Sequence, residues 1–150
     1  MTFSPHPEAV VGSRGGGTGI TAAVLALLGG LFHLIGVAGG ALMLAGDHDL
    51  GRALLTFATH LLLAALLTIG GVGLVLAKEF GRVTTIVGAV AALAVYVLVL
   101  ALGAFGVHFL GLLDTRIPAV YVAVLSVPAV GTLVLALVPP TARWVTRGWS

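Results

Sequence analysis

Four polar side chains lie deep inside long apolar stretches of the sequence, and their types are the ones best suited to chemistry. They are His33, His60, Tyr96 and Ser126. Imidazole, phenol and hydroxyl groups hydrogen-bond to ligands, and imidazole also carries protons and ligates metals. Ionisable groups in the apolar interior of a membrane mark binding sites and ion pathways. We therefore take these four residues as the candidate ligand-binding set.

The four side chains are predicted to lie at similar depth. With a helical rise of about 1.5 Å per residue, each is about 21 to 27 Å from the basic end of its helix. They are expected to form one polar patch in the outer half of a helix bundle. For His33 three roles are open: a neutral imidazole hydrogen-bonded to Tyr96, Ser126 or a backbone carbonyl; contact with a ligand or ion; or ligation of haem or another metal group.

A b-type haem is the most specific cofactor that these residues permit, because two histidines on facing helices can hold its iron. His33 and His60 lie on adjacent stretches, at depths that differ by about one helical turn. Against haem, few aromatic residues are available to line a pocket, and Arg52 is the nearest arginine for the propionates. We expect a colourless protein without a cofactor, and the electron-carrier hypothesis ranks last.

The remaining motifs predict no chemistry. Asp47, His48 and Asp49 are consecutive on a turn, where ligands rarely converge on a metal, so we interpret them as a solvated turn in which an aspartate caps the next helix. His108 lies at the outer end of an apolar stretch. The glycine-rich residues 13–19 lack the Lys-Ser/Thr ending of a phosphate-binding loop, so no nucleotide is expected.

Several classes of enzyme are also excluded. The sequence has no cysteine, which rules out disulfides, thiolate catalysis and iron–sulfur clusters. It has no Ser-His-Asp order, no paired carboxylates and no HExxH motif. We therefore predict a protein without catalytic residues and without a metal site.

The composition predicts a membrane protein. The chain is 59% hydrophobic and only 8% charged, whereas a soluble domain carries about 25% charged residues. Four charge-free stretches, 18–45, 53–77, 83–110 and 117–139, each exceed the roughly 20 residues that cross a bilayer as a helix. We predict an all-α membrane protein with four transmembrane helices. The net charge of +2 is too small to indicate nucleic-acid binding.

The short connections between these stretches predict an antiparallel up-down bundle. Residues 1–17 are expected to be a flexible tail, 18–142 the transmembrane domain, and 143–150 an interfacial tail anchored by Trp144 and Trp149. Gly81 is available for a positive φ in the second turn, and Pro128 is expected to kink the last helix. The Lys and Arg residues are in excess on the side of the termini and the second turn, which predicts that both termini face the cytoplasm. The membrane is expected to be a bacterial plasma membrane.

Small residues recur on one face of the first three predicted helices. In membranes such residues allow helices to approach closely. The expected packing positions are Gly36, Gly40, Ala64, Gly71, Gly88, Ala92 and Gly103. This pattern favours a non-catalytic accessory or assembly protein that packs against itself or another membrane protein. The alternative is a small-molecule or ion-binding membrane protein, including a transporter, that uses the polar patch.

One segment carries a family resemblance. The stretch "LLLAALLTIGGVGLVLAKEFGRVTTIVGAVAAL", residues 61–93, resembles small, uncharacterised four-helix membrane proteins of actinobacteria. In these proteins a helix ends in a short basic turn with a Gly-Arg pair, and the next helix begins at once. The resemblance implies the same four-helix membrane fold and no particular activity.

Overall fold

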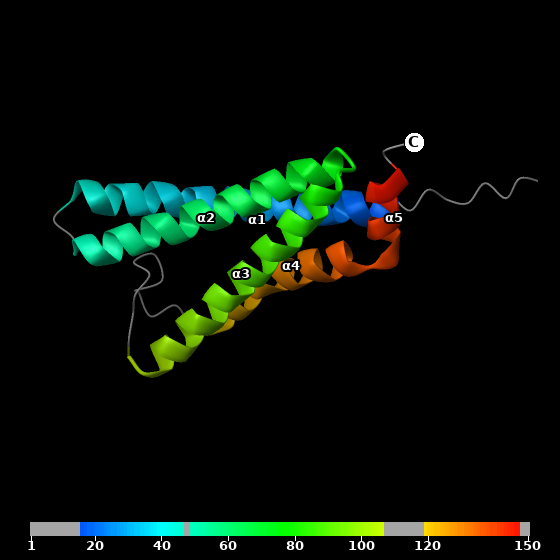
Figure 1. Ribbon diagram of the computed structural model, residues 1–150. Coiled ribbons are helices and arrows are strands. Elements are labelled where there is room, and N and C mark those ends of the chain that lie inside the picture. The colour runs from blue at the N-terminus through cyan, green and yellow to red at the C-terminus, as the bar shows by residue number, and fades with distance from the viewer. Residues whose placement is uncertain (1–15, 47–48, 107–118, 148–150) are drawn as a thin grey trace, which may run out of the picture.

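The computed structural model describes residues 16–46, 49–106 and 119–147, and within these ranges it is helical with no strand. The prediction of an all-α protein is confirmed. Helices α1 to α4 run in alternating directions, and the short α5 follows α4 (Figure 1). The elements are α1 (Gly16–Ala45), α2 (Leu50–Val75), α3 (Glu79–Ala104), α4 (Ala119–Leu137) and α5 (Pro139–Arg147).

Three helices, α1, α2 and α3, are each long and apolar enough to cross a membrane. The fourth predicted span, 117–139, falls on α4, which is long and apolar enough only together with α5, and the two helices are bent by 61°. The break falls at Pro139 and Pro140, which begin α5. Neither proline has an N–H to donate to the last carbonyls of α4, and proline fits the first turn of a new helix. Within residues 16–46, 49–106 and 119–147 there are therefore three such spans, or four if the bent pair counts as one.

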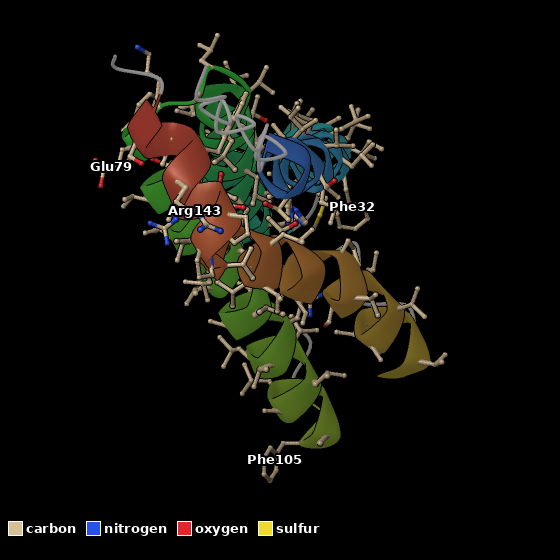
Figure 2. The ribbon with its side chains drawn as sticks, turned by 90° about the vertical axis from the view of Figure 1, so that its right-hand side faces the viewer. Phe32, Glu79, Phe105 and Arg143 are labelled. Atoms are coloured by element: carbon tan, nitrogen blue, oxygen red, sulfur yellow. The ribbon has the colours of Figure 1, made fainter. Side chains whose placement is uncertain are left out.

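The helices form two hairpins that meet at one end. α1 packs most extensively against α2, and α4 packs against both α3 and α1. Figure 1 shows the α1–α2 pair and the α3–α4 pair close together near α5 and splayed apart at the opposite end. Figure 2, seen from the α5 end, shows α3 and α4 running away below the α1–α2 pair. Arg82 joins α3 to α4 through a 2.8 Å hydrogen bond from its Nε to the Ala136 carbonyl.

Trp144 on α5, the residue expected to anchor the C-terminal tail at the membrane interface, is half-buried against the rest of the protein. Its indole covers the start of α1, where a Cβ at Gly19 would lie 2.8 Å from the ring. Its Nε1 donates to the Leu74 carbonyl over 3.2 Å. The next residue, Val145, is fully buried beside Ala22. α5 thereby closes the end of the bundle. Trp149 lies outside the described residues.

The turn between α2 and α3 differs from the expected one. Ala77, not Gly81, has the positive φ, at 52°. The Lys78 N–H donates to the Gly73 carbonyl and the Ala77 N–H to the Leu74 carbonyl, which is the Schellman pattern that ends many helices. Gly81 lies inside α3, where its missing side chain lets the α3 backbone contact Gly73 of α2.

Replacing Ala77 by glycine is expected to stabilise the protein. Alanine in the left-handed region costs about 1–2 kcal/mol relative to its right-handed conformation, and glycine adopts both regions readily. Ala77→Gly should therefore raise the free energy of unfolding by about 0.5–1 kcal/mol after the added chain entropy of glycine. The measurement is unfolding in mixed micelles. A lower stability than the parent would contradict the assigned turn.

Two other local expectations concern helix ends and proline. Asp49 caps α2, because its Oδ1 accepts the Arg52 N–H over 3.0 Å. Pro128 lies inside α4, which continues through it without interruption. The Thr132 hydroxyl donates to the Pro128 carbonyl over 2.8 Å, so this polar side chain is satisfied within its own helix.

Candidate functional site

Three of the four candidate residues form one buried chain of hydrogen-bonding groups. His33 lies on α1, His60 on α2 and Tyr96 on α3, and their side chains are 1%, 7% and 7% exposed. The Nδ1 atoms of the two histidines are 3.0 Å apart. The Tyr96 hydroxyl is 3.4 Å from Nε2 of His33. A polar chain thus connects three helices in the most apolar part of the protein.

Small residues create the space that this chain occupies. A Cβ at Gly36 would overlap the imidazole of His60, and a Cβ at Gly40 would lie 2.7 Å from the Phe57 backbone. Gly40 therefore brings the backbones of α1 and α2 close together, and Gly36 makes room for the His60 ring, as expected for small residues in membrane helices. His33 precedes Gly36 by about one turn, so it shares this face and meets His60 there.

The order of donors and acceptors along the chain follows from the geometry. Each neutral imidazole has one N–H donor and one bare nitrogen acceptor. If the Tyr96 hydroxyl donates to His33 Nε2, the proton of His33 is on Nδ1 and is donated to Nδ1 of His60. His60 then has its proton on Nε2. If the direction is reversed, His60 donates to His33, His33 donates to the Tyr96 oxygen, and Nε2 of His60 is bare.

The chain ends in an unsatisfied atom in both directions. His60 Nε2 is buried and has no hydrogen-bond partner within the part of the chain that the structure describes. Such atoms are rare in folded proteins and cost about 1–3 kcal/mol each. In the first direction the unsatisfied group is an N–H donor, and in the second it is a bare nitrogen. The free energy of the cluster therefore depends on which way its hydrogen bonds run.

A cavity of about 240 Å³ adjoins this chain. His33 and Tyr96 form part of its wall, together with Thr132 of α4, and the remaining lining is apolar. Leucines and alanines of all four long helices contribute to it, among them Leu28, Leu67, Ala92, Leu125 and Ala129. Ligand sites typically combine such an apolar wall with a few polar groups that fix orientation.

Ser126 does not join the hydrogen-bonded chain. Its hydroxyl donates to the Val122 carbonyl of its own helix over 2.8 Å, and it is not part of the cavity wall. Val122 does contact the cluster, since it packs with Tyr96 and Ala92. The structure thus brings together His33, His60 and Tyr96. Ser126 is not among them: it lies about one turn along α4 from Val122, the residue that packs with Tyr96.

The predicted packing residues divide into two groups. Six of them are buried: the alanines Ala64 and Ala92 and four glycines. At each of these glycines an added Cβ would contact a residue of another helix. The contacts are Gly36 with His60, Gly40 with Phe57, Gly71 with Leu27, and Gly88 with Leu66 and Leu67. Gly103 is different, because a Cβ there would meet no atom within 4 Å. The small residues are thus occupied largely by contacts within this chain.

A haem does not fit between the two histidines as they lie. An iron held from opposite sides by two imidazole nitrogens at about 2 Å each needs them about 4 Å apart, with a macrocycle between the rings. The two Nδ1 atoms are 3.0 Å apart and face each other directly. Within the described residues, no group of three or more His, Cys, Asp or Glu side chains is arranged to hold a metal ion. Asp47, His48 and His108 lie outside these residues.

The sequence did not indicate the cavity itself. Its α4 wall consists of Leu125, Pro128, Ala129 and Thr132, a set with the i, i+3, i+4, i+7 spacing of one helix face. The hydroxyl of Thr132 on this face was the available signal. It was hard to find, because α4 is apolar on every side and no polar stripe marks which side faces the bundle.

Comparison with known proteins finds no family model, curated protein or solved structure that matches the chain.

Proposed function

We propose that this chain is a multi-pass membrane protein that binds a small, lipid-soluble molecule in the cavity beside His33 and Tyr96. The observation that carries the proposal is a mostly apolar cavity of about 240 Å³ whose wall includes two members of a buried polar chain. An apolar cavity of about 150 Å³ is large enough to bind benzene. The volume here suits a somewhat larger ring compound with one polar substituent.

The surroundings of the cavity suggest a route of entry from the lipid. Leu28 and Phe32 line the cavity and are also 56% and 38% exposed. In Figure 2, Phe32 lies beside α1 on the side toward α4. Both residues belong to a helix long and apolar enough to cross a membrane. A ligand dissolved in the hydrocarbon therefore reaches the wall of the cavity without crossing water.

The arrangement in the membrane is part of this proposal. α1, α2, α3 and the bent α4–α5 pair form the four spans. The α5 end carries Lys78, Arg82 and Arg143, since Trp144 and Arg82 contact the ends of α2 and α4 there, whereas Arg52 is at the opposite end of α2. By the positive-inside rule this end and both termini face the cytoplasm, in a bacterial plasma membrane.

Assembly through glycine-lined faces is the competing proposal. Its support is weaker because Gly36, Gly40, Gly71 and Gly88 already contact other helices of the same chain. The surface left for a partner consists of the outer faces of the long helices, with exposed side chains such as Leu62 on α2, Val97 on α3 and Val127 on α4. In a membrane the same faces contact lipid. The hydrogen-bonded cluster and its cavity are features that an assembly role does not require.

Filling the cavity should abolish ligand binding. The probe is 4-fluoroacetophenone, detected by fluorine NMR saturation transfer with the full chain in lipid nanodiscs. Ala129 lines the cavity, so the larger side chain of Ala129→Leu occupies the ligand volume and should weaken binding at least about tenfold, or about 1.4 kcal/mol. The matched control is Val130→Leu, which adds bulk to a neighbouring residue that is 46% exposed.

The expected result is saturable binding to the parent protein and to Val130→Leu, and its loss in Ala129→Leu. Empty nanodiscs give the signal from partition into lipid. If the parent gives no more signal than empty nanodiscs, or if both variants bind equally well, the proposed site is wrong. In that event, co-purification of the native protein with another membrane protein would favour the assembly proposal.

A further inference from the structure

The polar groups that a ligand would meet in the cavity are few. Three side chains of its wall carry a polar atom: His33, Tyr96 and Thr132. The Thr132 hydroxyl already donates to the Pro128 carbonyl. Nδ1 of His33 faces His60 on the other side. The Tyr96 hydroxyl lies at the end of the hydrogen-bonded chain, 3.4 Å from His33 Nε2. It is therefore the group left to recognise a polar substituent of the ligand.

Without a ligand, the Tyr96 hydroxyl has one partner among the residues that the structure describes, His33. The Tyr96 O–H has an acceptor when it donates to His33 Nε2. In the reverse direction this O–H would have no acceptor, so the first direction is favoured. The chain then runs from Tyr96 to His33 to His60, and it leaves the N–H of His60 Nε2 buried without a partner. An unpaired buried N–H is the rarer and costlier kind of unsatisfied group.

A ligand with a hydrogen-bond acceptor removes this cost. If the Tyr96 hydroxyl donates to the ligand, its oxygen accepts the N–H of His33 Nε2. His33 Nδ1 is then bare and accepts the N–H of His60 Nδ1 over the same 3.0 Å contact. His60 Nε2 becomes a bare nitrogen, and an acceptor without a partner is tolerated more readily than a donor. Every N–H and O–H in the cluster is then satisfied.

We propose that the cavity selects a lipid-soluble molecule with a carbonyl group, and that its binding reverses the hydrogen-bond direction along Tyr96, His33 and His60. This inference rests on the proposed function. The protonated nitrogen changes from Nδ1 to Nε2 in His33 and from Nε2 to Nδ1 in His60. Tyr96 and each imidazole keep one proton before and after, so the cluster stays neutral.

Because His60 is not part of the cavity wall, the change reports ligand binding at a second interface. The imidazole of His60 lies against Gly36, between α1 and α2. A ligand bound in the cavity thereby alters the hydrogen-bonding state of a group that lies outside the cavity wall, at the α1–α2 contact. Along the existing contacts the Tyr96 proton passes to His33 Nε2 and the His33 Nδ1 proton passes to His60 Nδ1. Solvent takes up the proton of His60 Nε2 and returns one to the Tyr96 oxygen, so the number of protons in the cluster is unchanged.

The test compares two probes of the same shape in the full chain in nanodiscs. They are 4-fluoroacetophenone, which carries the carbonyl, and 1-fluoro-4-isopropylbenzene, in which a methyl group replaces the oxygen. Because one hydrogen bond contributes about 0.5–1.5 kcal/mol net, the ketone should bind about two- to tenfold more tightly. In protein labelled with nitrogen-15 at histidine, the ketone should convert His60 Nε2 from a protonated to a bare nitrogen, and the isopropyl probe should not.

Tyr96→Phe is the matched variant, because it removes the hydroxyl and keeps the ring. It should bind both probes with equal affinity and show no change at His60. If neither probe binds the parent protein, the proposed function itself fails. If both probes bind the parent equally and the histidine signals do not change, the cavity stands as a ligand site and the carbonyl-linked reversal is overturned.

Discussion

Gly81→Ala is expected to destabilise the protein by about 1–3 kcal/mol, as overpacking of a tight contact does. A Cβ at Gly81 would overlap the Gly73 backbone and lie 2.5 Å from the Leu74 nitrogen. Backbone cannot rotate away as a flexible side chain can, so α2 and α3 would have to separate. This separation would also move Tyr96 on α3 relative to the histidines. The measurement is the free energy of unfolding in mixed micelles.

Gly103→Ala is the control for this prediction. It makes the same substitution in the same helix, at a position where a Cβ meets nothing within 4 Å. Since alanine has a higher helix propensity than glycine by about 1 kcal/mol, Gly103→Ala should be neutral or slightly stabilising. Equal effects of the two substitutions would show that helix propensity, and not the contact with Gly73, decides their outcome.

The second large effect concerns the polar cluster and has two parts. His60→Leu alone removes one unsatisfied buried atom, Nε2 of His60, and creates another, Nδ1 of His33, so its net cost is that of the lost hydrogen bond between the two rings, about 0.5–1.5 kcal/mol. The combined variant His33→Leu, His60→Leu, Tyr96→Phe removes every polar atom of the cluster. Replacing all partners by apolar groups of similar size is nearly neutral or stabilising, so the combined variant should be more stable than His60→Leu.

This comparison separates a structural role from a binding role. We expect the combined variant to keep its stability and to lose the preference for the ketone over the isopropyl probe. Retained stability together with lost ligand preference would show that the cluster serves binding and is not needed for folding. If the combined variant is instead less stable than His60→Leu, and the destabilisations add, the three side chains are chiefly a structural element.

The helical class and the convergence of three polar residues were predictable from the sequence. A helix rises by a constant amount per residue, so depth can be counted from the basic ends. This count put His33, His60 and Tyr96 at comparable depth, and they are in contact. Rotation about the helix axis is harder to predict. On α1 to α3 small residues mark the packed face, but α4 has no such stripe, and Ser126 faces its own backbone instead.

The turn residues and α5 were less predictable, for different reasons. The sequence offers no glycine at the position that ends α2, and Gly81 is the first glycine after it, whereas Ala77 adopts the left-handed conformation in the turn. Trp144 beside an arginine is typical of a membrane interface. The cradle that Gly16 and Gly19 form for its ring is a contact between residues more than a hundred positions apart, and no local pattern reports it.

The central claim is that a small molecule occupies the cavity between the four long helices, and the most direct measurement locates the bound probe. Intermolecular NOEs are recorded between 4-fluoroacetophenone and methyl-labelled full-length protein in nanodiscs with deuterated lipids. The account predicts NOEs from the probe ring to the methyl groups of Leu67, Leu125 and Ala129, which line the cavity. NOEs confined to exposed residues such as Val97 or Val134 would place the probe on the outer surface and contradict the claim.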